Sequence, residues 1–167
     1  MDFFEVINTR RSIRSYKNKP IPEEIVEKII ESGSLAATAR NIQPWVFIAV
    51  TDQKILKHLG DLAENGRFIS EAPLCIAVVS SDTKYYLEDC SAATQNMLLS
   101  ARALGIASCW VAGDKKPYCQ DVLKLLNVPL TFKLVSLVAL GYPQKEAEFK
   151  KAAKKSVSEI LRRGRFE

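Results

Sequence analysis

Three arginines and a serine lie within five residues near the start of the chain, in the sequence Arg10-Arg11-Ser12-Ile13-Arg14. A guanidinium group can donate two parallel hydrogen bonds to the oxygens of a phosphate, and a serine hydroxyl can add a further donor. No glycine-rich turn leads into a helix here, so the segment is neither a P-loop nor a dinucleotide-binding fingerprint. The residue types indicate a phosphate site, although a solvated basic edge explains the spacing equally well.

A second polar segment follows in the sequence Thr38-Ala39-Arg40-Asn41-Ile42-Gln43-Pro44-Trp45. Asn41 and Gln43 carry both donors and acceptors, and their spacing in a short loop suits the polar edge of a planar heterocycle. Taken alone, the segment is more typical of a capped loop that leads into a strand. Arg40 is an extra cation in this loop, and local pairing or exposure to water is favoured over contact with an acidic substrate.

The four cysteines and the single histidine exclude several other kinds of site. Cys75, Cys90, Cys109 and Cys119 form no Cys-x-x-Cys pair, and His58 stands alone, so no metal site is expected. The same composition gives little support to a hydrolytic triad. We therefore expect free thiols and assign no catalytic side chain.

Length and composition predict a single domain over residues 1–167. Of these residues, 47% are hydrophobic and 26% are charged, which is neither a disordered nor a membrane composition. No apolar run approaches the roughly 20 residues of a membrane span, and the N-terminus lacks the pattern of a signal peptide. These features predict a cytoplasmic protein that binds no membrane.

Hydrophobic periodicity predicts the elements that must position the polar segments. The predicted helices span residues 2–9, 22–33, 35–39, 52–63, 86–104, 121–126 and 156–163. The predicted strands span residues 45–51, 74–80, 107–112 and 133–140. The continuous apolar run of the last strand indicates burial on both faces. This order predicts an α/β (α+β) fold, a layered sheet with helices on both sides.

The net charge of +5 is concentrated near the two ends of the chain, at residues 10–14 and 150–165. Two terminal clusters could converge on one anion, or could bind nucleic acid. The chain has no recognisable nucleic-acid motif and no aromatic residues interleaved with the basic ones. We therefore expect no nucleic-acid partner.

Together, the two polar segments resemble the nitroreductase family. Arg-x-Ser-x-Arg is followed about thirty residues later by Asn-x-Gln-Pro-Trp. Other segments of the resemblance follow in the family's order: Asn65 shortly before Glu71-Ala72-Pro73, Ala93-Thr94-Gln95-Asn96, Leu104-Gly105-Ile106, Cys109-Trp110-Val111-Ala112-Gly113, Gly141-Tyr142-Pro143 and the basic tail. Each piece is weak alone, but their order and spacing make the likeness strong over nearly the whole chain.

The resemblance implies a nitroreductase-like fold with a central mixed sheet of about four to five strands. It also implies an interlocked homodimer with FMN in the grooves between the subunits. The long helix at residues 86–104 is expected to expose apolar surface that a second chain would cover.

The resemblance also assigns the FMN contacts. The phosphate and ribityl end would be held by basic and hydroxyl side chains, namely Arg10, Arg11, Ser12, Arg14, Lys154 and Lys155. The flavin ring would be approached by side chains and backbone groups, namely Thr38, Asn41 and Gln43 of the other subunit, with Asn65, Ala112 and Gly113. Two departures are visible: the family's Pro-Ser pair is Ala37-Thr38, and its usual tail arginine is a lysine.

A ping-pong reaction is the activity that the resemblance implies. NADH or NADPH would reduce the flavin, and a nitroaromatic compound or quinone would take the electrons. Dehalogenation, ene reduction or another flavin reaction on the same fold is an alternative, as is a non-catalytic flavin-binding protein. Tyr118 and Cys119 lie in a stretch that could border the site, although exposed loop residues are the favoured interpretation.

Overall fold

A four-stranded sheet forms the centre of the computed structural model, which describes residues 1–145, 149 and 152–166. Its strands are β1 (Trp45–Val50), β2 (Leu74–Ser81), β3 (Ala107–Ala112) and β4 (Phe132–Gly141), in the order β1-β2-β4-β3. The expected strand number is therefore confirmed. β2 and β4 are almost entirely buried, which confirms the burial predicted for the last strand.

Every pairing within this sheet is antiparallel, so the expectation of a mixed sheet is wrong in this respect. The sole parallel pairing among the described residues is an isolated bridge between Ser12 and Ser108. A buried strand has the same apolar pattern in either direction, and the pattern therefore could not decide strand orientation.

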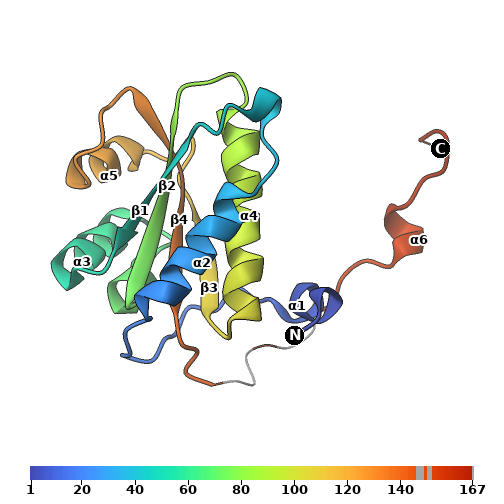
Figure 1. Ribbon diagram of the computed structural model, residues 1–167, viewed down its shortest axis with the longest axis horizontal. Coiled ribbons are helices and arrows are strands. Elements are labelled where there is room, and N and C mark those ends of the chain that lie inside the picture. The colour runs from blue at the N-terminus through green and yellow to red at the C-terminus, as the bar shows by residue number, and fades with distance from the viewer. Residues whose placement is uncertain (146–148, 150–151, 167) are drawn as a thin grey trace.

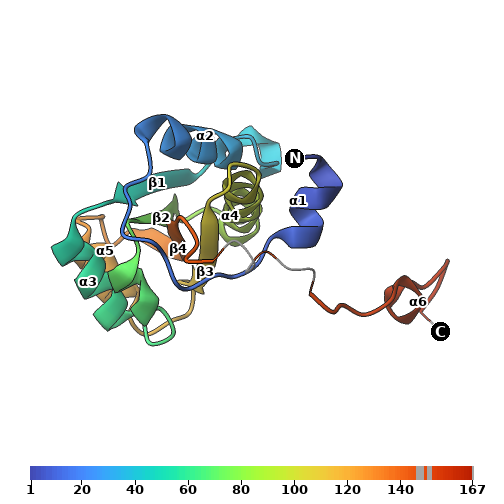
Figure 2. The same ribbon diagram turned by 90° about the horizontal axis from the view of Figure 1, so that it is seen from below.

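Helices cover both faces of the sheet, as predicted (Figures 1 and 2). One face packs against α2 (Glu23–Ser34) and α4 (Tyr86–Ala103), and the other against α3 (Gln53–Leu62) and α5 (Cys119–Leu125). β4 supplies both cores because its side chains alternate between the two faces. The sheet thus leaves its outer edges, β1 and β3, for other contacts.

Local capping explains where several helices begin and end. The Asp2 carboxylate accepts a hydrogen bond from Glu5 N at 3.0 Å, which caps α1 (Phe3–Thr9). Asp52 caps α3 in the same way. Gly105, with a φ of +74°, ends α4 in the left-handed region that glycine adopts at low cost.

Three elements differ from the sequence prediction. The helix expected over residues 35–39 is replaced by the 3-10 turn η1 (Ala39–Asn41), in which two residues have positive φ and cannot continue a right-handed helix. The 3-10 helix η2 (Arg67–Glu71) was not predicted. The last helix is shorter than expected: α6 spans Val157–Ile160 and ends where Leu161 is extended.

More than half of the exposed large apolar residues lie on α1 and the tail, and none lies on α4. α4 carries no exposed large apolar residue, so the expected apolar face of the long helix is wrong. Phe3, Phe4 and Ile7 of α1 are exposed, as are most residues of the tail. In both views α6 lies away from the sheet and its helices (Figures 1 and 2). None of the described helices has the length and apolar character of a membrane span.

Candidate functional site

The basic segment runs in extended form beside the outer edge of β3. Ile13 N donates a hydrogen bond to the Ser108 carbonyl at 3.0 Å, and Ser12 forms the parallel bridge to the same residue. Side chains of an extended segment alternate between two sides. Arg10, Ser12 and Arg14 therefore share one side, while Ile13 enters the core on the other.

The three polar side chains on that side gather around Cys109 of β3. Burial raises the pKa of the Cys109 thiol, but the charge of Arg14, a hydrogen bond from Ser12 and the charge of Arg10 all oppose this rise. Burial, and then the charge of Arg11, lower the pKa of Arg10. This part of the edge is consequently a compact cluster of positive charge, which an anion would relieve.

Arg11 lies on the opposite side of the segment from this cluster. Its guanidinium donates hydrogen bonds to the carbonyls of Asn8, at 2.8 Å, and Arg10. Arg11 lines an open hollow of about 760 Å³ with Lys154 and Lys155 of the tail. The structure thus brings these three basic residues together, but around a different space from Arg10, Ser12 and Arg14.

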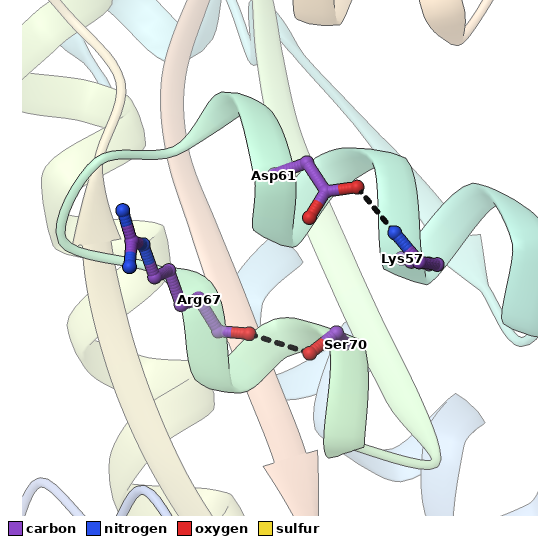
Figure 3. Close-up of polar contacts among 4 residues, drawn as sticks. All are labelled: Lys57, Asp61, Arg67 and Ser70. Carbon is purple, nitrogen blue, oxygen red and sulfur yellow. Dashed lines mark hydrogen bonds and ion pairs between the residues drawn. The ribbon is translucent and has the colours of Figure 1, made fainter.

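Asn65 lies in the exposed turn between α3 and η2. Gly66 is packed so closely that a β-carbon there would lie 3.0 Å from the Val111 side chain, which places the turn against the end of β3. η2 is closed by a hydrogen bond from Ser70 Oγ to the Arg67 carbonyl at 2.7 Å (Figure 3). Figure 3 also shows the exposed Lys57–Asp61 pair of α3, from which the Arg67 side chain points away.

Arg14 connects the cationic cluster to this turn. Its guanidinium lies 5.7 Å from the centre of the Phe68 ring, and Phe68 belongs to η2. A cation held over an aromatic ring is stabilised without a carboxylate partner. The Arg14 guanidinium therefore lies between the cationic cluster around Cys109 and the turn that carries Asn65, with no carboxylate needed to hold it there.

Ala112 and Gly113 end β3 on the same edge. The Ser108 carbonyl points outward, so by the alternation of strand hydrogen bonds the backbone groups of Ala112 also point outward. Ala112 is exposed, whereas the Gly113 N–H donates inward to the Val135 carbonyl at 3.0 Å. The Ala112 N–H is thus left facing the space beside the edge.

Two side chains hold the carbonyls of this turn. The Tyr118 hydroxyl donates to the Ala112 carbonyl, and the Cys119 thiol donates to the Gly113 carbonyl. Tyr118 is buried and Cys119 begins α5, so the interpretation of both as exposed loop residues is wrong. Burial raises the pKa of both side chains, which keeps them protonated as donors.

The outer edge of β3 therefore forms one elongated strip with two chemical ends. Cationic and hydroxyl donors gather at the end near Ser108, whereas an exposed amide side chain and an outward N–H lie at the end near Ala112. A ligand with a phosphate at one end and a planar heterocycle at the other matches this donor set. The residues present thus fit a phosphorylated flavin.

The loop that carries Thr38, Asn41 and Gln43 lies at the other end of the long helix. Thr38 Oγ1 donates to Asp89 Oδ2 at 2.9 Å near the start of α4, whereas Arg102 Nε donates to Thr9 Oγ1 at 2.9 Å near its end. Thirteen residues separate Asp89 from Arg102, which corresponds to roughly 20 Å of helix. One chain does not bring this loop to the basic segment that follows Thr9.

Sequence reasoning missed Asp89 and the position of Cys109 in the site, and it favoured exposed loop positions for Tyr118 and Cys119 although it noted that their stretch could border the site. An acidic residue in the first turn of a helix is ordinarily explained by the helix dipole, so Asp89 carried no distinctive signal. The alternation of Arg10, Ser12 and Arg14 was visible in the sequence. It would have separated Arg11 from them had the segment been recognised as extended.

Comparisons with known proteins agree on one family. The family model described as "Nitroreductase family" matches residues 7–74 and 63–142. A protein of Archaeoglobus fulgidus, named as a candidate NADH dehydrogenase/NAD(P)H nitroreductase, is 39% identical over 155 residues, which cover 89% of each chain.

Solved structures support the same assignment. A protein of Parabacteroides distasonis, named in the same way, superposes with a TM-score of 0.91 at 31% identity, covering 97% of this chain and 98% of that one. A candidate nitroreductase of Desulfovibrio desulfuricans, solved in complex with FMN, gives a TM-score of 0.86 at 25% identity, covering 100% and 99%.

Proposed function

Because the chain belongs to the nitroreductase family, we propose that it is an FMN-dependent oxidoreductase. It takes electrons from NADH or NADPH and passes them to a small acceptor such as a nitroaromatic compound or a quinone. The observation that carries this proposal is the strip along β3, where cationic donors and an outward N–H lie at opposite ends of one edge.

The residues of the strip would hold FMN by its two ends. Arg10, Ser12 and Arg14 would bind the phosphate and ribityl chain, since together they offer charge-assisted hydrogen bonds to an anion. Asn65 and the Ala112 N–H would face the ring. The Gly113 N–H is already bonded to Val135, so Gly113 would contribute close packing rather than a donor.

Arg11, Lys154 and Lys155 would act from the neighbouring hollow. Their shared position on one open surface suits long-range attraction of phosphate, or a contact that forms when a second chain reorders the tail. Lysine contributes charge without the bidentate geometry of arginine.

A homodimer would complete the site. The loop that carries Thr38, Asn41 and Gln43 contacts the start of α4, too far from the strip of its own chain to reach it. The same loop of the partner subunit would therefore supply these side chains. The exposed apolar residues of α1 and the extended tail offer the surface that a second copy would cover. Each chain, residues 1–167, would then form a single FMN-binding domain.

When bound, FMN would supply the redox chemistry, exchanging hydride with the nicotinamide and electrons with the acceptor in a ping-pong order. The chain's own contribution is electrostatic. Arg14 and Asn65 would stabilise negative charge at the polar edge of the ring. Water can deliver protons, so no side chain of the strip need act as a general acid.

The test is the absorbance spectrum of the purified protein, followed by titration with NADH in the absence of oxygen. We expect flavin bands that NADH bleaches and that a quinone or nitroaromatic compound restores. A protein that neither retains FMN nor takes up added FMN would refute the proposal. Flavin bands that neither NADH nor NADPH bleaches would instead indicate a non-catalytic flavin binder.

The size of the protein at micromolar concentration tests the dimer. We expect the flavin-loaded protein to elute as two chains. A monomer that retains FMN tightly would contradict a site built from both subunits.

A further inference from the structure

We propose that Asp89 is a positioning residue that fixes the shape of the loop Thr38–Gln43 and thereby sets the affinity for FMN. The inference rests on the proposed function, because it takes Asn41 and Gln43 as flavin contacts. Asp89 itself belongs to α4 and would touch no part of the cofactor.

Asp89 binds the start of the loop through both carboxylate oxygens. Oδ2 accepts a hydrogen bond from Thr38 Oγ1 at 2.9 Å, and Oδ1 accepts one from Ala39 N at 3.1 Å. Asp89 is buried, with 5% of its surface exposed. A buried carboxylate requires such partners, so the loop and the helix depend on each other.

The contact continues from Asp89 to the predicted flavin ligands. Thr38 Oγ1 accepts a hydrogen bond from Gln43 N at 3.2 Å while it donates to Asp89. The side-chain amide of Gln43 donates from Nε2 to Asn41 Oδ1 at 3.0 Å. Hydrogen bonds therefore join the buried carboxylate through Thr38 to the backbone of Gln43, the residue whose side chain is bonded to that of Asn41.

The loop needs such support because its backbone is unfavourable. Arg40, Asn41 and Gln43 have φ values of 55°, 56° and 51°, in the left-handed region that residues other than glycine rarely adopt. Strained conformations of this kind persist where the surrounding structure determines them, and they concentrate at functional sites. Asp89 is the buried group that determines this one.

Packing alone would not hold the loop. A cavity of about 100 Å³ lies between the loop and the start of α4, lined by Arg40, Thr83 and Asp89 among others. The Thr83 hydroxyl is buried and has no hydrogen-bond partner within the described chain. No described cation forms an ion pair with Asp89. The hydrogen bonds at Asp89 are therefore the contacts that fix the loop on this side.

A loop that leaves the binding shape for most of the time binds correspondingly more weakly, since the apparent dissociation constant rises as the competent fraction falls. We expect Asp89→Ala to raise the dissociation constant for FMN at least tenfold, with Asp89→Asn intermediate because one acceptor oxygen remains. Glu88→Ala, at an exposed position of the same helical turn, is the matched control and should leave the constant unchanged.

Amide hydrogen exchange in the flavin-free protein provides a readout that does not depend on FMN. The N–H groups of Ala39 and Gln43 should exchange faster in Asp89→Ala than in the wild type or in Glu88→Ala. Thr38→Val removes the intermediate hydroxyl but keeps the Asp89 carboxylate and its hydrogen bond from Ala39 N. Because Thr38 is itself assigned to the flavin site, its test is the exchange of the Gln43 N–H in the flavin-free protein. The effect of Thr38→Val on this exchange should not add to that of Asp89→Asn, since both break the connection from Asp89 through Thr38 to Gln43 N.

The outcomes separate the inference from the proposed function. Wild-type protein that binds FMN, with the Asp89 variants equally tight, would overturn the inference alone. Additive effects of Thr38→Val and Asp89→Asn on the exchange of the Gln43 N–H would overturn the route through the hydroxyl. Wild-type protein that binds no FMN would overturn the proposed function and with it the role of Asp89. Should Asp89→Ala fail to fold, Asp89→Asn carries the comparison of FMN binding, and Thr38→Val that of amide exchange.

Discussion

Replacement of Arg10 by alanine should weaken FMN binding without destabilising the protein. Arg10 is partly buried beside Arg11, and both burial and this neighbour lower the pKa of Arg10. A lowered pKa means that folding disfavours the charged form, so at neutral pH the charge of Arg10 opposes folding of the flavin-free chain. An anion in the strip would reverse this effect.

The size of the loss follows from the kind of bond. A hydrogen bond to a charged group contributes about 1.5–3 kcal/mol, so Arg10→Ala should raise the dissociation constant for FMN roughly ten- to a hundredfold. The dissociation constant of Arg10→Lys should lie between those of the wild type and Arg10→Ala, because lysine keeps the charge but loses the bidentate geometry of arginine. The melting temperature of flavin-free Arg10→Ala should equal or exceed that of the wild type.

Titration of the flavin-free protein with FMN, followed by flavin fluorescence, measures these constants. Arg11→Ala is the matched control, since its guanidinium is bonded to the carbonyls of Asn8 and Arg10 on the opposite side of the segment. Arg11→Ala should reduce the binding free energy of FMN by much less than Arg10→Ala does, and this reduction should become smaller with added salt.

Two results would refute this reasoning. A dissociation constant for Arg10→Ala within twofold of the wild type would remove Arg10 from the phosphate site. An Arg11→Ala effect as large as that of Arg10→Ala would show that the alternation along the extended segment does not select the phosphate ligands.

Three further predictions concern the strip and the core. Tyr118→Phe removes the donor to the Ala112 carbonyl and should lower the free energy of unfolding by about 1 kcal/mol. The melting temperature should then fall by about 2–4 °C, and an unchanged melting temperature would contradict the contact. Gly113→Ala would place a β-carbon 2.8 Å from the Leu134 side chain and should cost about 1–3 kcal/mol in urea unfolding, together with weaker FMN binding as the end of β3 shifts. Burial raises the pKa of the Cys75 thiol from 9.0 to about 12. Because the unfolded chain therefore loses the thiol proton at lower pH than the folded chain, the free energy of unfolding should fall from about pH 9 upward by roughly 1.4 kcal/mol per pH unit. Cys75→Ala should show a shallower decline over pH 9–11, and equal slopes would refute the raised pKa of Cys75.

The sequence by itself determined the elements and the kind of ligand. Periodicity located all four strands and the long helix because it records which side chains are buried, and burial is what those elements share in the folded state. The types of residue at positions 10–14 and 41–43 were compatible with phosphate and heterocycle binding. The order and spacing of both segments, through their resemblance to the nitroreductase family, indicated FMN.

Only the tertiary structure decided how these groups are arranged. The direction of the strands, the side of the segment on which Arg11 lies and the burial of Tyr118 all depend on contacts between parts of the chain that are distant in sequence. Asp89 is the clearest case, because its partner Thr38 lies 51 residues away. A hydrogen bond of that kind leaves no periodic trace, since neither residue type is unusual at its own position.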